Sequence, residues 1–290
     1  MSYMNRGFAS LSRNINGRRP LTNDELFKLA PSIFAADRHE SRSERYTYIP
    51  TSEIVDGMRA NGFDPVFCQQ GRSRIEGKEA YTKHLVRFRP TDAVVTAKRI
   101  GGLYPEVCVV NSHDGTSAYK VMAGVLRLVC LNGNVVSDGE TTNISIPHKG
   151  DILGQVIEGS FEVIQDSRLA IEHADHWAGI NLNPDEQLVL AEAAHVIRFG
   201  DAEGNVETPI RPAQLLHARR TEDQGSDLYR VGQRIQENMI RGGLSAYGRD
   251  ANNRPRLTTS REVKSIDGDI KMNKALWALT AHMARLKEAA

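Results

Sequence analysis

The 290-residue sequence predicts an α+β protein, in which an antiparallel β-sheet of hairpins in the first half packs on long helices and the second half is helical. Strand-like runs separated by tight-turn signals make up most of residues 66–147. From Gly150 onward the apolar residues recur at helical spacing instead. Strands joined by tight turns pair antiparallel, and runs of strands followed by runs of helices are typical of the α+β class.

The N-terminal part is predicted to be an arm with one short helix, which Thr22 or Asn23 can cap and Pro31 ends. A second helix is expected to begin at Thr51 or Ser52, with either side chain as its cap. Predicted domains are the arm at 1–46, an α+β core at 47–240, and a basic loop with a C-terminal helix at 241–290.

Turn signals delimit the strands. Asp114-Gly115 and Asn132-Gly133 each predict a hairpin, because glycine tolerates a positive φ. Glu76-Gly77-Lys78 is expected to turn between two further strands. The predicted strands are Tyr46–Ile49, Val66–Arg74, Tyr81–Arg89, Ala93–Arg99, Val107–His113, Ala118–Cys130 and Thr141–Pro147.

Helices dominate the second half of the prediction. Asn183 followed by Pro184 and two acids is a strong helix start. Gly242–Pro255, which is polar and rich in glycine and asparagine, is expected to be a loop. The other predicted helices are Gly150–Trp177, Pro212–Arg219, Leu228–Ile240 and Lys271–Glu288, the last with Leu276, Trp277, Leu279, Met283 and Leu286 directed inward.

Composition favours a cytoplasmic protein. Cys68, Cys108 and Cys130 are odd in number and lie in apolar runs, which favours packed, reduced thiols over disulfides. The polar N-terminus does not resemble a secretory signal, and no run of about eighteen apolar residues exists to span a membrane.

Charge is segregated along the chain. Residues 1–134 carry 19 Lys+Arg against 13 Asp+Glu, residues 135–210 carry 3 against 14, and residues 211–290 carry 15 against 9. The two basic segments could bind the phosphates of a nucleic acid. The acidic segment could repel nucleic acid or contact the basic surface of a neighbouring subunit. Chance clustering of surface charge is the alternative.

The predicted strand Tyr81–Arg89 has a cationic face, because side chains alternate along a strand. A cationic strip near an aromatic ring suits single-stranded nucleic acid, whereas the alternative is a solvated face that resists aggregation. The candidate nucleic-acid-binding residues are Arg72, Arg74, Lys78, Lys83, Arg87 and Arg89, with Lys98, Arg99, His113 and Lys120 as lesser candidates.

Residues 109–117 crowd polar groups around a tight turn. A catalytic interpretation makes His113 a general base beside Asp114, or Ser112 a nucleophile. Ligand contact and simple turn chemistry remain open alternatives. Adjacent strand residues point to opposite faces, so Ser112 and His113 do not readily pair.

No cofactor or metal is expected. His173 and His176 share a helix face, and His195 is a conceivable third ligand, but the HExxH spacing is absent. The sequence also contains no GxxxxGK[ST] phosphate loop and no GxSxG elbow. An enzyme is therefore the less favoured class.

The run Val109–Tyr119, followed by Gly124, Leu126–Cys130 and Asn132-Gly133, resembles a phage- and plasmid-related family catalogued as domain of unknown function 932. The resemblance covers about residues 20–240. It implies a gene of bacterial mobile elements, often near DNA-processing genes, and hence a bacterial host cytoplasm. It implies no catalytic residues.

The order of helix, hairpin sheet and long helix is also similar to the core of single-strand annealing proteins of the Rad and RecT/Redβ types. These form rings or filaments and hold DNA without hydrolysing ATP. The leading hypothesis is therefore an oligomeric protein that binds and anneals single-stranded DNA. The alternatives are a protein-binding inhibitor of host defence, of anti-restriction or anti-CRISPR type, and an enzyme that uses His113 and Asp114.

Overall fold

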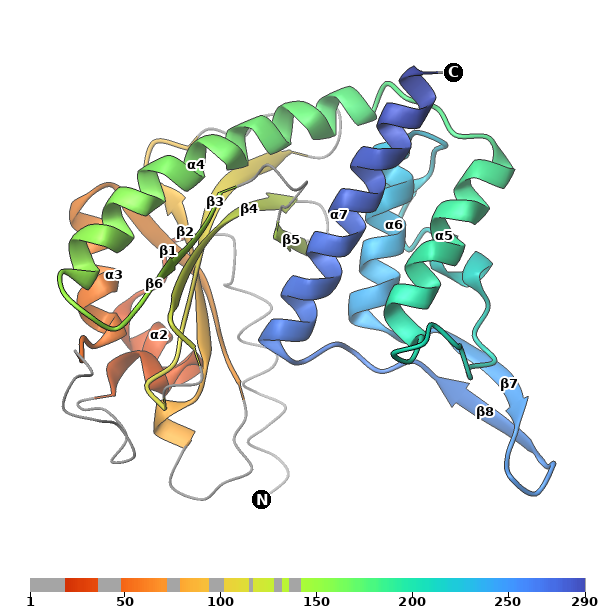
Figure 1. Cartoon of the computed structure of the whole chain (residues 1–290), viewed down its shortest axis with the longest axis horizontal. Coiled ribbons are helices and arrows are strands. Elements are labelled where there is room, and N and C mark those ends of the chain that lie inside the picture. Colours follow the sequence, from red (N-terminus) through yellow and green to blue (C-terminus); the bar gives the residue numbers. More distant parts are fainter. Residues whose placement is uncertain are drawn as a thin grey trace. The chain divides into compact units, whose positions relative to one another are not determined.

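A six-stranded antiparallel sheet occupies the first half of the chain in the computed structural model (Figure 1). Strands β1 to β4 follow in order, and both β5 and β6 pair with the free edge of β4. This arrangement, with helices in the second half, confirms the α+β class. The strands are β1 (Phe63–Gln70), β2 (His84–Pro90), β3 (Leu103–Asn111), β4 (Tyr119–Arg127), β5 (Asn132–Val135) and β6 (Asn143–Ile146).

The structure describes residues 19–35, 48–71, 79–93, 102–114, 117–127, 132–135 and 142–289. The predicted turn at Glu76-Gly77-Lys78 lies outside these residues, as do Cys130 and most of the predicted strand Ala93–Arg99. The chain forms two units, and the main boundary between them falls after Ile171. It therefore lies inside a helix, α4 (Ile152–Trp177).

Three short helical segments precede the sheet strands or connect them. Thr22 caps α2 (Asn23–Leu29) through a capping box with Glu25, as the sequence predicts. The others are η1 (Pro31–Phe34) and η2 (Glu79–Tyr81). The next full helix, α3 (Thr51–Ala60), starts where predicted, but its N-cap is Pro50, and Thr51 is its first helical residue.

Helices α3 and α4 pack on one face of the sheet. Phe161 of α4 contacts Phe63 of β1 edge to face, with ring centroids 5.2 Å apart. The Ser167 hydroxyl donates to the Glu106 carbonyl at 2.8 Å and accepts from the Gly124 amide at 3.2 Å. These contacts tie α4 to the central strands β3 and β4, so the core of the first unit lies between this helix and the sheet.

The second unit is built from the last turn of α4 and three further helices. Asn183 caps α5 (Pro184–Phe199) as predicted, through a capping box with Glu186. Trp177 and Trp277 pack together, with ring centroids 4.7 Å apart. The remaining elements are η4 (Pro212–Leu216), η5 (Thr221–Asp223), α6 (Leu228–Arg241), β7 (Ser245–Arg249), β8 (Pro255–Thr259) and α7 (Ile266–Glu288).

Four local predictions need correction. The hairpin that Asn132-Gly133 predicts does form between β4 and β5, but these two residues lie in β5, paired with Arg127 and Leu126, and not in the turn. Tyr48 and Ile49, the described part of the predicted strand Tyr46–Ile49, are not in a strand. Gly242–Pro255 is not a loop throughout, because it contributes β7 and the start of β8 to a hairpin. Leu286 is not directed inward, since 67% of it is exposed.

Cys68 and Cys108 are buried and are not in a disulfide, and burial raises the pKa of the Cys68 thiol to about 12. Both are therefore packed thiols, as the sequence predicts. Among the described residues, no helix combines the length and the apolar character needed to cross a bilayer.

Candidate functional site

Arg87 and Arg89 of β2 are buried, not exposed. Their common partner is Glu106 on β3, whose carboxylate lies 3.1 Å from Nε of Arg87 and 2.6 Å from Nη2 of Arg89. The Arg89 guanidinium also lies 3.8 Å from the centroid of the Tyr104 ring. Every residue of β2, an interior strand, is buried. The predicted solvent-exposed cationic strip is therefore wrong at these two positions, because both faces of β2 are covered, which alternation along one strand does not reveal.

The other predicted cations are dispersed. Lys83 is half-buried just before β2, and Lys120 is exposed on β4. Arg72, Arg74, Lys78, Lys98 and Arg99 lie outside the described residues, so their role stays a prediction.

The polar run after β3 is buried. Asn111, Ser112 and His113 have no exposed surface. The Ser112 hydroxyl accepts from the Ser117 amide at 2.8 Å, which closes the turn. His113 instead contacts the Thr51 side chain on α3. The two side chains thus have separate partners, and turn chemistry accounts for Ser112.

Thr51 is the centre of a buried polar cluster, which we call the Thr51 cluster. Its hydroxyl Oγ1 lies 2.8 Å from Nε2 of His84, 3.2 Å from Nε2 of His113 and 3.1 Å from Nδ2 of Asn111. The Tyr119 hydroxyl lies 3.3 Å from the same atom and donates to the Ile49 carbonyl. Three strands are thereby joined to the first turn of α3.

Both ring nitrogens of His84 have polar partners. Nδ1 lies 2.9 Å from the Ser32 hydroxyl and 3.2 Å from the Thr82 carbonyl, and Nε2 lies 2.8 Å from the Thr51 hydroxyl. The Thr51 oxygen accepts from the Asn111 amide, and it is also within hydrogen-bond distance of Nε2 of His113. The cluster is thus a continuous buried network from Ser32 to His113.

Burial favours the neutral form of both imidazoles. It lowers the pKa of His84 to about 4, and together with the neighbouring His84 and His148 it lowers the pKa of His113 to about 3. A histidine of such low pKa is a weak base at neutral pH, and His113 has no exposed surface. The Thr51 cluster therefore suits a structural role better than the catalytic one considered for His113 and Asp114.

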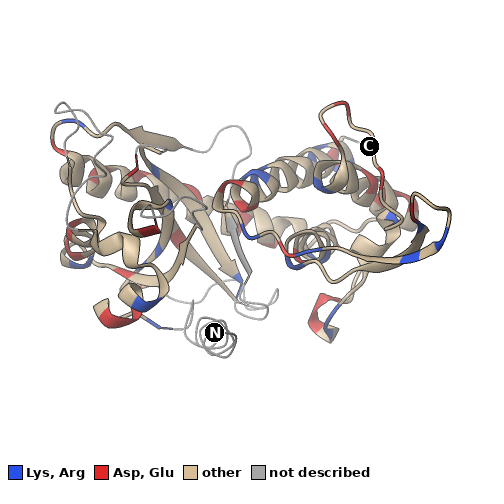
Figure 2. Cartoon of the chain, turned by 90° about the horizontal axis from the view of Figure 1, so that it is seen from below, with Lys and Arg blue, Asp and Glu red and all other residues tan. Residues whose placement is uncertain are grey.

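The most exposed candidate surface is the β7–β8 hairpin of the second unit, which projects from the helices (Figures 1 and 2). Tyr247 and Leu257 are cross-strand partners and are 77% and 53% exposed. Three exposed arginines, Arg249, Arg254 and Arg256, follow toward the tip. The hairpin thus combines an exposed aromatic ring with positive charge. The sequence had predicted only a basic loop in this segment.

Side-chain bonds hold both ends of the hairpin. At the tip, the Asp250 carboxylate accepts from the amides of Asn252 and Arg254 at 2.9 Å each. At the base, Arg219 donates to the Gly242 carbonyl and Arg198 donates to the Arg261 carbonyl. The ribbon is therefore a defined element on a fixed support.

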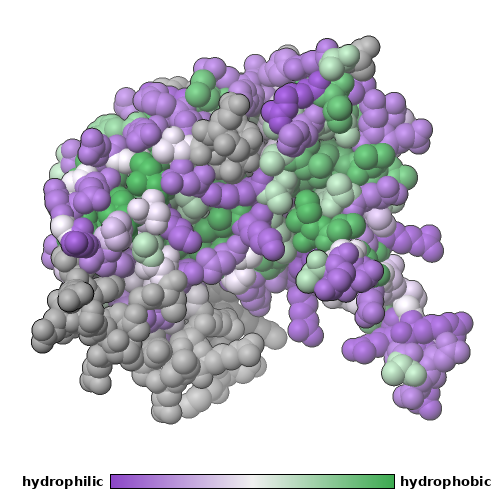
Figure 3. All heavy atoms as spheres, viewed as in Figure 1, coloured by the Kyte–Doolittle hydropathy of each residue, from purple (hydrophilic) through white to green (hydrophobic). Residues whose placement is uncertain are grey.

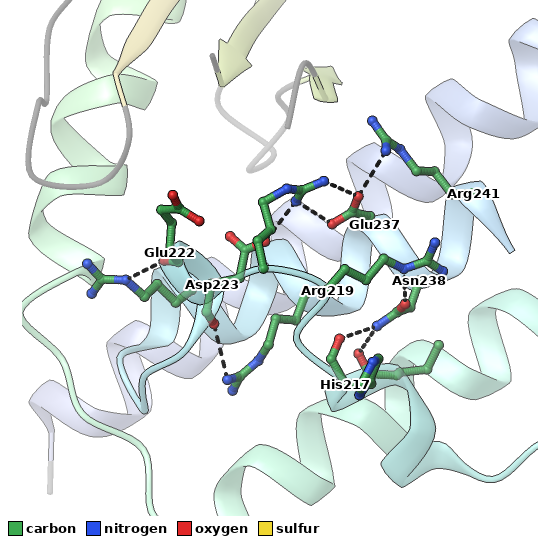
Figure 4. Close-up of polar contacts among 11 residues, drawn as sticks. His217, Arg219, Glu222, Asp223, Glu237, Asn238 and Arg241 are labelled. Carbon is green, nitrogen blue, oxygen red and sulfur yellow. Dashed lines mark hydrogen bonds and ion pairs between the residues drawn. The ribbon is translucent and has the colours of Figure 1, made fainter. Parts of the chain in front are cut away.

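Helix α6 carries that support through a buried polar network (Figure 4). The Glu237 carboxylate accepts hydrogen bonds from both Nη atoms of Arg220, at 2.7 and 2.6 Å. Its Oε1 also lies 3.1 Å from Nη1 of Arg241. Asn238 accepts from Nε of Arg219 at 2.8 Å. Arg241, one of the basic residues of the last third, is thus engaged in an ion pair, whereas Arg219 links this network to the hairpin base.

The histidines considered for a metal have other contacts. His176 pairs with Glu288, and Nε2 of His195 lies 2.7 Å from the Ile210 carbonyl. His173 lies against the Trp177 ring. In the part of the chain that the structure describes, no group of three or more His, Cys, Asp or Glu residues is arranged to hold a metal ion.

Comparison with known proteins places this architecture in a family. The family model "Domain of unknown function (DUF932)" matches residues 38–277. The chain belongs to this family. Two curated relatives from Escherichia coli K12, "UPF0380 protein YafZ" and "UPF0380 protein YfjQ", are each 44% identical to it over 263 residues, covering 90% of both chains. No solved structure matches, so the similarity to single-strand annealing proteins stays a prediction.

The DUF932 match includes both the Thr51 cluster and the β7–β8 hairpin. It therefore extends further toward the C-terminus than the resemblance had implied. Sequence reasoning missed Thr51 as the centre of a cluster, because a threonine before an apolar helix is indistinguishable from a cap. His84 and Asn111 lie on the face of their strands that the helix covers. Only the alternation of side chains along each strand could have indicated from the sequence that these two residues are directed toward a helix.

Proposed function

We propose that this DUF932 protein binds nucleic acid, preferentially single-stranded DNA, through the β7–β8 hairpin. The observation that carries the proposal is the exposed pair Tyr247 and Leu257 beside three exposed arginines. Bases stack on exposed aromatic rings while arginines contact the phosphates, and this combination is sequence-tolerant. Annealing of complementary strands without ATP hydrolysis, in a ring or a filament, is the finer form of the proposal.

The composition of the hairpin supports binding over simple solvation. Residues 245–259 contain three arginines and one aspartate, so the net charge is +2. The aspartate, Asp250, uses its carboxylate on backbone amides of the tip. Arginines alone would serve solubility, but an exposed tyrosine and leucine in register do not.

Fluorescence anisotropy with labelled single-stranded and double-stranded oligonucleotides, at low and moderate salt, tests the proposal. Replacing Arg249, Arg254 and Arg256 with alanine should weaken binding at least tenfold. It should also reduce the slope of log affinity against log salt by about two, at roughly 0.7 per neutralised phosphate on a single strand. Tyr247→Ser should weaken binding of the single strand more than that of the duplex, because only unpaired bases stack on the ring.

Arg168→Ala is the matched control, because Arg168 is an exposed arginine on α4, outside the hairpin. It should leave both affinity and salt slope unchanged. Absence of binding by the wild type at low salt, or equal losses from Arg168→Ala and the hairpin variants, would refute the proposal.

A further inference from the structure

Helices α5 and α7 carry an apolar stripe that lies outside the core of the second unit. On α5, Val189 and Val196 are 57% and 44% exposed and are seven residues apart, so they share a face. On α7, Leu286 is 67% exposed. Leu279 and Met283, at helical spacing from Leu286, are half-buried beside it. Figure 3 shows apolar surface over these two helices.

The two stripes form one surface, because the helices are antiparallel neighbours. Lys287 near the end of α7 lies 2.9 Å from Glu186 at the start of α5. Positions along the helix axes can be counted from the level of this pair, at about 1.5 Å rise per residue. Val189 then lies between Leu286 and Met283 along the axis, and Val196 lies within one turn of Leu279. The buried faces of both helices are occupied by other residues, among them Leu190 and Ala194 on α5.

Charge flanks this surface asymmetrically. The outer edge of the stripe on α5 carries the exposed acids Asp185 and Glu192, whereas α7 carries the exposed Arg285. The Arg285 guanidinium donates to Nδ1 of His282 at 2.9 Å. One helix of the pair thus carries negative charge beside its apolar stripe, and the other carries positive charge.

We infer that this α5–α7 face binds the same face of a second copy of the chain, and that in the absence of nucleic acid the protein is a closed two-fold dimer. A two-fold axis parallel to the helices brings α5 of each copy opposite α7 of the other in an antiparallel four-helix arrangement. The apolar stripes then cover each other. Arg285 of one copy lies within a helical turn of Asp185 of the other, and about 6 Å along the helix axis from Glu192 of the other. The charge pattern is self-complementary only in this arrangement.

The inference does not depend on nucleic-acid binding, and its test contains no nucleic acid. Size-exclusion chromatography with multi-angle light scattering on the full chain should give twice the chain mass of 32.2 kDa. Val189→Glu and Leu286→Glu should each raise the dissociation constant at least about tenfold, and a circular-dichroism spectrum equal to that of the wild type shows that each variant is folded. Leu257→Glu, which places the same charge on the hairpin, should leave the dimer intact.

A charge exchange gives the sharper result. Glu192→Arg alone and Arg285→Glu alone each place like charges opposite each other and should weaken the homodimer. In an equimolar mixture of the two variants, the heterodimer pairs the introduced arginine with the introduced glutamate and keeps the native pair on the other side, so dimer should reappear. A monomeric wild type, a larger ring or filament that the Val189 and Leu286 variants leave unchanged, or no recovery on mixing would overturn the inference.

Discussion

At the residue scale, Thr51 shows how one small hydroxyl can organise a core. It is buried in the first turn of α3 and satisfies His84, Asn111 and His113 at once. A threonine at this place is commonly a helix cap, yet the N-cap of α3 is Pro50. The role of the side chain is thus set by the strands that pack against the helix and not by the helix itself.

Thr51→Val should destabilise the protein by about 2–4 kcal/mol, because it removes the common partner and leaves buried imidazole and amide groups unsatisfied. Thr51→Ser keeps the hydroxyl and should cost much less. Ser52→Ala is the control, since the alternative cap interpretation would make Ser52 an equal candidate. Urea unfolding followed by circular dichroism measures all three, and equal losses for Thr51→Val and Ser52→Ala would contradict the cluster.

Glu106 is the second residue whose removal should be costly. It has no exposed surface and is the ion-pair partner of both Arg87 and Arg89. Breaking a buried ion pair by removing one partner costs about 3–5 kcal/mol, because the remaining charge stays buried. We expect Glu106→Gln to lower the free energy of urea unfolding by that order, whereas Glu53→Gln on α3, an exposed acid, should be neutral. A loss of unfolding free energy below about 1 kcal/mol would contradict this prediction, because it would mean that other groups compensate the charges of Arg87 and Arg89.

At the element scale, the sequence predicted most helices and strands because their signals are local. Asn183 with Glu186 marked the start of α5, and Asp114-Gly115 predicted a hairpin where β3 and β4 pair antiparallel. The β7–β8 hairpin was missed because Tyr247 and Leu257 are too few apolar residues for alternation to predict a strand. The buried state of Arg87 was missed because its partner Glu106 lies on another strand, beyond any local pattern.

Glycine at the hairpin base provides an element-scale prediction. Gly242 and Gly243 both have positive φ, +65° and +82°. A Cβ at Gly242 would lie 2.6 Å from the Ser260 carbonyl oxygen, whereas at Gly243 the nearest atom would be 4.0 Å away. Gly243→Ala should therefore carry only the conformational cost of about 1 kcal/mol, and Gly242→Ala clearly more. Thermal unfolding compares them, and an equal shift would contradict the close approach.

At the scale of the whole molecule, chemistry is divided between the two units. His84, His113 and His148, whose pKa values burial lowers, all belong to the first unit. The two tryptophans of the chain, Trp177 and Trp277, both belong to the second. The acid-sensitive histidines therefore lie in the first unit, whereas tryptophan fluorescence reports the unfolding of the second unit.

Acid should destabilise the first unit before the second. An unfolded histidine titrates near pH 6.5 but these remain neutral in the folded state, so the unfolded chain binds more protons below that pH. Their stabilising contribution is complete above pH 6.5. It falls by up to about 1.4 kcal/mol per pH unit for each histidine, until the folded pKa of about 4 or 3 is reached.

Urea unfolding at pH 7 and pH 5, followed in parallel by circular dichroism and tryptophan fluorescence, measures this difference. The sheet signal should move to lower urea at pH 5, while the fluorescence transition moves less. Transitions that coincide at both pH values would show that the units unfold together and would contradict the prediction. His113→Gln should flatten the pH dependence of the sheet signal.

The turn at the tip of the β7–β8 hairpin has a practical consequence. Its geometry is maintained locally, by the Asp250 carboxylate and the two amides that donate to it, and residues 251–254 are exposed. Exposed turns of this kind tolerate inserted sequence. A short epitope or a photocrosslinking amino acid placed at Asn252 would therefore leave the folded protein intact, and it would capture in living cells whichever macromolecule approaches the ribbon.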